Sequence, residues 1–178
     1  MLKNNEHSYG LIAKIVHWLC AIIIIGLFAL GLWMLDLNYY DNWYTLAPHY
    51  HVSIGILLAV IMVFRVLWRL FSVQPKPTSS LSKLEHILAY WVHYTFYVII
   101  FGIIVTGYLI PTGDNRSIDV FNWFTLPSLG ALFDQQADIA GRFHLWMSYG
   151  LMGLIALHAL AALKHQFVDR DGTLKRML

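Results

Sequence analysis

Four long apolar stretches occupy most of this 178-residue sequence and limit what it can fold into. They lie near residues 12–35, 49–71, 86–110 and 143–167, and each exceeds the roughly 20 residues that a helix needs to cross a bilayer. Charged residues make up only 12% of the chain, against roughly 25% in typical soluble domains. The sequence therefore predicts an all-α integral membrane four-helix bundle, with residues 1–178 forming a single domain.

The placement of basic residues predicts the orientation of this bundle. If the N-terminus is cytoplasmic, ten of the twelve lysines and arginines fall on the cytoplasmic side, and only Arg116 and Arg142 lie outside. This asymmetry follows the positive-inside rule, so both termini should be cytoplasmic. The basic residues are spread over the helix ends rather than gathered in one patch, which gives no indication of nucleic-acid binding.

Four histidines fall at two depths of the predicted bundle. His144 and His158 are fourteen residues apart on the last apolar stretch, which in a helix is about 21 Å along the axis and about 40° around it. His17 lies in the inner half of the first stretch, and His51 begins the second stretch from the outer side. The antiparallel order of the helices therefore pairs His17 with His158, and His51 with His144.

This pairing indicates two metal centres stacked across the membrane. Imidazole is costly in lipid unless it has a partner, and histidine is a common axial ligand of heme iron. We therefore predict two non-covalent hemes, held by His17, His51, His144 and His158. A C-x-x-C-H motif is absent and Cys20 is the only cysteine, so covalent attachment through that motif is excluded. Alternatively, each histidine could simply bond a carbonyl or water at a helix end.

Several other residues have two possible roles. His86 and His93 share a face of the third stretch and could replace His17, or line a quinone or proton site. His49 is an alternative to His51 if the register differs by two residues, and His165 is expected at headgroup level. Arg65 and Arg69 could bind heme propionates or only snorkel to the interface. Some glycines could make room for a porphyrin or serve ordinary packing: Gly55, Gly102, Gly107 and Gly150.

Taken together, these motifs resemble the bacterial cytochrome b561 family over nearly the whole chain. They are H-W at His17, H-V-S-x-G from His51, R-x-x-x-R at Arg65 and Arg69, and H-x13-H at His144 and His158. The resemblance implies a multi-pass protein of the bacterial inner membrane with two b-type hemes and quinone-linked electron transfer. It also implies an oxidoreductase that oxidises superoxide at the periplasmic side and reduces ubiquinone.

The resemblance leaves a choice of function. Larger relatives use the same bundle as a membrane subunit that links a separate dehydrogenase to the quinone pool, but no obligate protein partner is evident here. In the superoxide interpretation, Arg142 and Arg116 are the only cations available to attract the anion, and Glu85, His86 or Lys164 could supply protons for the quinone. A metal-ion transporter is a third possibility, although the apolar stretches hold almost no carboxylates except Glu85. The long connection from 111 to 141, with its aromatic cluster, could be a lid or only a tether.

Overall fold

The structure is a computed structural model that describes residues 1–76 and 83–178. Its four long helices are long and apolar enough to cross a membrane, which confirms the predicted all-α membrane bundle. They are α1 (Leu11–Asp36), α2 (Leu46–Phe71), α3 (Lys83–Thr112) and α4 (Gln136–Lys164). The predicted helices lie within these bounds, except that the last one was expected to extend to residue 167.

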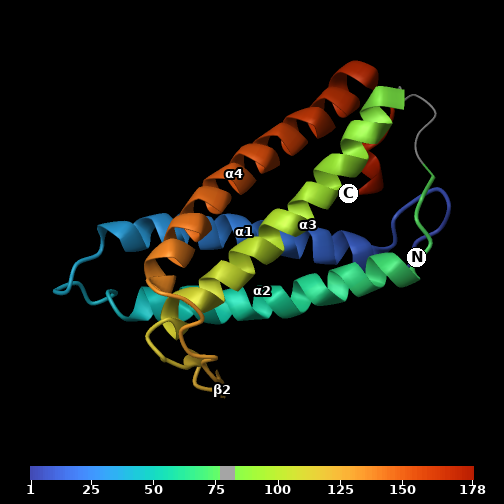
Figure 1. The fold of residues 1–178 in the computed structure, drawn as a ribbon. Helices are drawn as coiled ribbons and strands as arrows, with labels where there is room; N and C mark the ends of the chain where they lie inside the picture. The colour runs from blue at the N-terminus through green and yellow to red at the C-terminus, as the bar shows by residue number, and fades with distance from the viewer. Residues whose placement is uncertain (77–82) are drawn as a thin grey trace.

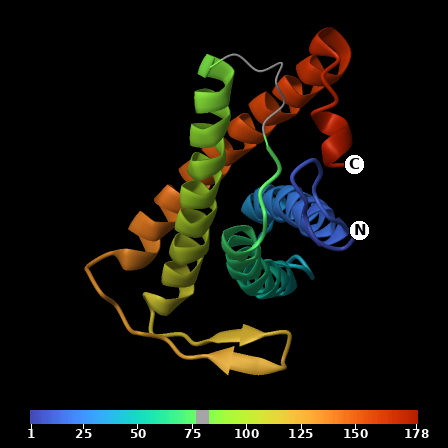
Figure 2. The same cartoon turned by 90° about the vertical axis from the view of Figure 1, so that its right-hand side faces the viewer.

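The helices are arranged as two neighbouring pairs. Helices α1 and α2 lie side by side, and α3 and α4 form the second pair (Figures 1 and 2). Both chain termini lie at one end of the bundle, and the α1–α2 connection lies at the opposite end. We call these the inner end and the outer end; the cytoplasmic location of the inner end stays a prediction from the charge pattern.

The centre of the bundle is a small apolar cluster to which every helix contributes: Cys20, Leu58, Met62, Ile100 and Leu151. Large apolar side chains also cover the outside, where Ile22, Val60 and Leu157 are exposed. A soluble protein would not expose so many large apolar residues, whereas lipid solvates them. The apolar outer surface thus agrees with the length and composition of the helices.

Helix α4 begins at Gln136, seven residues before the predicted start at residue 143. The prediction followed apolarity alone, and these first turns are partly polar. Gln136 is buried, its Oε1 accepts from the Leu132 N–H at 2.7 Å, and its Nε2 donates to the Leu109 carbonyl at 2.9 Å. The start of α4 is therefore tied to the end of α3 by polar contacts, and not by its hydrophobic face.

A two-stranded hairpin covers part of the outer end. Strands β1 (Ile118–Val120) and β2 (Phe124–Leu126) pair antiparallel, with Val120 opposite Phe124. Ser53 of α2 is fully buried; its Oγ donates to the Asp119 carbonyl at 3.4 Å and accepts from the Phe121 N–H at 3.1 Å. The hairpin is thus fixed onto α2, which favours a cover over a loose tether.

The C-terminal segment folds back across the inner end. A short π-helix (His165–Asp169) follows α4, and a 3₁₀ turn (Leu174–Arg176) comes after it. Trp18 of α1 donates its Nε1–H to the Met177 carbonyl at 2.9 Å. The tail is therefore joined to α1 one residue after His17.

Candidate functional site

The outer histidine pair joins α2 to α4. The ring centroids of His51 and His144 are 6.1 Å apart, and the ring planes make an angle of 66°. His144 Nδ1 lies 3.0 Å from the Ile103 carbonyl, to which it donates, and Thr106 Oγ1 lies 3.3 Å away. Because the proton is then on Nδ1, the lone pair of His144 Nε2 is free to bind a metal. This second-shell hydrogen bond to a carbonyl is typical of metal-binding histidines.

Two glycines let the outer imidazoles lie close to neighbouring helices. A Cβ on Gly31 of α1 would lie 3.2 Å from His51 Cε1, and one on Gly107 of α3 would lie 3.1 Å from His144 Cε1. Of these, Gly107 was considered in the sequence and Gly31 was missed. Gly102 instead faces Met147, while a Cβ on Gly55 or Gly150 would meet no atom within 4 Å.

The inner pair joins α1 to α4. The ring centroids of His17 and His158 are 6.4 Å apart, with an angle of 70° between the planes. Arg65 of α2 donates from a guanidinium nitrogen to His17 Nδ1 at 3.1 Å. Arg65 therefore contacts a predicted ligand directly, whereas Arg69 is exposed at the end of α2.

A third imidazole belongs to the inner group. The ring centroid of His93, on α3, is 5.6 Å from that of His158. The ring of Phe96, also on α3, is 5.4 Å from that of His158. The Nδ1 of His93 donates to the carbonyl of Ala89 one turn earlier. His86, by contrast, is exposed.

Both pairs have the spacing that a shared iron requires. Two imidazoles on opposite sides of one iron have centroids about 6.2 Å apart, because each metal–nitrogen bond is about 2.0 Å and the ring centre lies about 1.1 Å further. The observed separations are 6.1 and 6.4 Å. In addition, Nδ1 of His51 is buried with no hydrogen-bond partner in the described part of the chain. The spacing of both pairs therefore fits two bis-histidine heme sites.

Two of the other histidines lie outside these groups. The ring of His49 packs against Tyr50 at 5.6 Å and against Phe121 of the hairpin at 6.5 Å. His165 begins the π-helix, with its Nδ1 2.9 Å from Asp169 and 3.1 Å from Asp171. Each is thus occupied by contacts at one end of the bundle.

The charged candidates lie at the two ends. At the inner end, Lys164 Nζ bridges Glu85 at 3.0 Å and Asp169 at 2.8 Å, so two of the predicted proton donors are in contact. At the outer end, Arg116 pairs with Asp114 at 2.7 Å. Arg142 is exposed, and within residues 1–76 and 83–178 it has no ion-pair partner.

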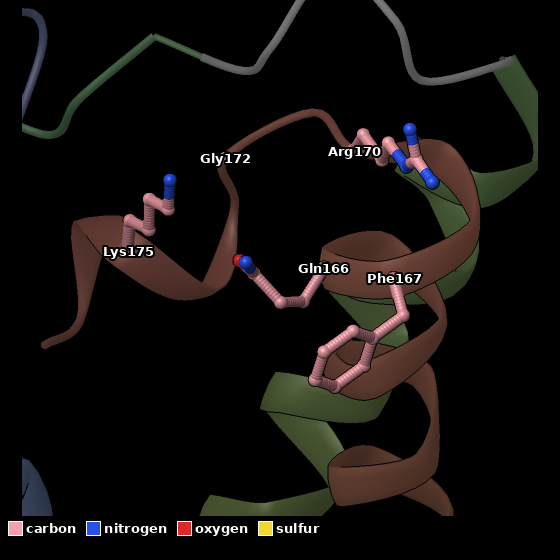
Figure 3. A pocket seen from close by; sticks show the side chains of 5 residues that line it. All are labelled: Gln166, Phe167, Arg170, Gly172 and Lys175. Carbon is pink, nitrogen blue, oxygen red and sulfur yellow. The ribbon is translucent and has the colours of Figure 1, made fainter.

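A pocket of ≈ 330 Å³ lies beyond the end of α4 (Figure 3). It is lined by Gln166, Phe167, Arg170, Gly172 and Lys175. Figure 3 shows the side chain of Arg170 turned away from Lys175, so the two charges do not converge on one point. None of the paired histidines lines it.

Four membrane helices with paired histidines are the arrangement expected of a membrane cytochrome with b-type heme. Comparison with known proteins agrees: the family model for prokaryotic cytochrome b561 matches residues 8–178, and the chain belongs to this family. It is 48% identical over 175 residues to cytochrome b561 homolog 2 of Escherichia coli (strain K12), covering 98% of this chain and 93% of that protein.

A second relative is more distant. The chain is 30% identical over 168 residues to the probable superoxide oxidase CybB of Yersinia pestis, covering 92% of this chain and 91% of that protein. The expected family is thus confirmed, and with it a multi-pass electron-transfer protein of the bacterial inner membrane.

Proposed function

We propose that this protein is a two-heme cytochrome that oxidises superoxide at the outer end and reduces ubiquinone. The observation that carries the proposal is the pair of imidazole couples, at 6.1 and 6.4 Å, one above the other along α4. The name of the more distant relative supports superoxide as the donor. When bound, heme supplies a one-electron redox centre at each couple.

In this proposal two histidines would hold each heme. His51 and His144 close the outer site from α2 and α4, and His17 and His158 close the inner site from α1 and α4. Donation from His144 Nδ1 to the Ile103 carbonyl holds that ring in the ligating tautomer. With two imidazoles holding each heme, the substrate would exchange electrons with it without binding to the iron.

Arg142 is proposed to attract the superoxide anion. It lies on α4 two residues before His144, is exposed, and forms no ion pair within the described chain, although Asp138 lies one turn earlier on the same helix. Arg116 is a weaker candidate, because Asp114 offsets its charge. A local cation of this kind raises the encounter rate with a small anion, and salt screens the effect.

The reaction also needs protons on the quinone side. Two superoxide anions each lose one electron and leave as dioxygen, and ubiquinone takes these two electrons with two protons to become ubiquinol. Glu85 is proposed to deliver protons, since it lies near the inner end beside Lys164. Glu85 and Lys164 are partly exposed, which gives this pair access to water.

The test uses purified full-length protein, an enzymatic source of superoxide and a soluble ubiquinone analogue. We expect superoxide-dependent quinone reduction that is slowed several-fold in Arg142→Gln at low salt, and less so at high salt. Arg116→Gln is the matched control and should slow the reaction less, because Asp114 already offsets that charge.

The same assay separates the alternatives. If superoxide does not reduce the protein while a chemically reduced sample still reduces the quinone, the chain is instead an electron-transfer subunit for another donor. A colourless purified protein would contradict both redox functions and favour metal-ion transport. Equal rates in the two arginine variants would refute the role of Arg142.

A further inference from the structure

The inner and outer histidine groups differ in the number of imidazoles they hold. Among the described residues, His51 and His144 contact each other's rings and no third histidine. At the inner end, His158 contacts both His17 and His93. The nearest additional histidine at the outer end, His49, packs on Tyr50 and the hairpin instead.

The hydrogen bonds also give His17 and His93 opposite tautomers. A guanidinium can only donate, so His17 Nδ1 accepts from Arg65 and the ring proton of a neutral His17 must lie on Nε2. Nδ1 of His93 donates to the carbonyl of Ala89, which leaves the lone pair on Nε2. In this arrangement His93, and not His17, has a free ring nitrogen of the kind that binds iron.

The distances make an exchange between the two possible. The His93–His158 ring separation of 5.6 Å is about 0.6 Å shorter than two ligands of one iron require, a change within reach of small rotamer adjustments. The His17–His158 separation already matches that of two ligands of one iron. Before His17 can bind through Nε2, however, Arg65 must release Nδ1 so that the ring proton can move there from Nε2.

We propose that His93 is a reserve axial ligand of the inner heme, able to take the place of His17 opposite His158. This inference rests on the proposed two-heme function. It predicts that the inner site tolerates loss of its α1 ligand, whereas the outer site does not tolerate loss of its α2 ligand. Arg65 favours the exchange by occupying the nitrogen of His17 that would otherwise carry the proton.

The test measures the heme-to-protein ratio and the electron paramagnetic resonance spectrum of purified full-length variants, without any activity assay. His17→Ala is expected to keep two low-spin hemes per chain, with one altered low-spin signal. The double variant His17→Ala/His93→Ala should keep one. The matched control, His51→Ala, should also keep one, because among residues 1–76 and 83–178 no third imidazole contacts this pair.

Three results would overturn the inference: one heme in His17→Ala, a high-spin inner heme in that variant, or the same low-spin spectrum with and without His93. If His17→Ala does not accumulate in membranes, His17→Phe replaces it, because it keeps a ring of similar volume. The same results are expected of that variant, and the same results would overturn the inference. The wild type separates the two proposals. Fewer than two hemes there refutes the two-heme function, whereas two hemes there with one in His17→Ala refutes only the role of His93.

Discussion

Gly107 provides the sharpest test of how the outer histidine is held. A Cβ at this position would lie 3.1 Å from His144 Cε1 and 3.4 Å from Nδ1. Carbon atoms in contact prefer about 3.5–4.0 Å, so Gly107→Ala must push the imidazole by about 0.4 Å or more. The hydrogen bond from His144 Nδ1 to Ile103 opposes this movement, and ligand geometry generally has to be held within about 0.5 Å.

The expected magnitude follows from overpacking, which costs about 1–3 kcal/mol. Because each 1.4 kcal/mol is tenfold in an equilibrium constant, heme binding at the outer site should weaken by about 5- to 150-fold. The assay is transfer of heme from the purified variant to an excess of an apo-globin, followed by absorbance. The inner heme should be retained as in the wild type.

Gly102→Ala is the matched control for this variant. It lies on the same helix, and its Cβ would also be 3.1 Å from a neighbour, but that atom is the sulfur of the flexible Met147 side chain. Both substitutions gain the same helix propensity, about 1 kcal/mol, so the comparison isolates the contact with the ring. If the two variants lose heme equally, or neither does, His144 is not held in the way described.

Two further predictions concern the ends of the bundle. Ser53→Ala leaves the Phe121 N–H without its acceptor and should lower the stability of the hairpin by about 1–3 kcal/mol. Amide hydrogen exchange should therefore rise in residues 118–126. Unchanged exchange there would show that Ser53 does not fix the hairpin. Trp18→Phe removes the donor to the Met177 carbonyl and should speed proteolysis of the last residues. Cleavage no faster than in wild type would show that this bond does not hold the tail.

The sequence predicted the structure best where a single property, such as the length of an apolar stretch or the spacing of histidines along a helix, determines it. Apolar length placed the four helices, and antiparallel order with helical spacing brought His17 to His158 and His51 to His144. The early start of α4 was missed because buried polar contacts of Gln136, and not apolarity, extend that helix.

Contacts between distant segments could not be predicted in the same way. The approach of Gly31 to His51 depends on the distance between two helix backbones, for which the local sequence carries no signal. The hairpin was also missed, since its tight turn has Phe121 and Asn122 at φ of 51° and 57°, and a phenylalanine seldom adopts this conformation. The contact of Arg65 with His17 likewise follows from packing of α2 on α1.

The most direct measurement is the heme content and ligation of the purified wild-type protein. We predict two hemes per chain, both six-coordinate and low-spin in the oxidised state, and only one after His144→Ala. A single heme in the wild type would contradict the two bis-histidine sites. A high-spin heme that binds cyanide directly would also contradict them.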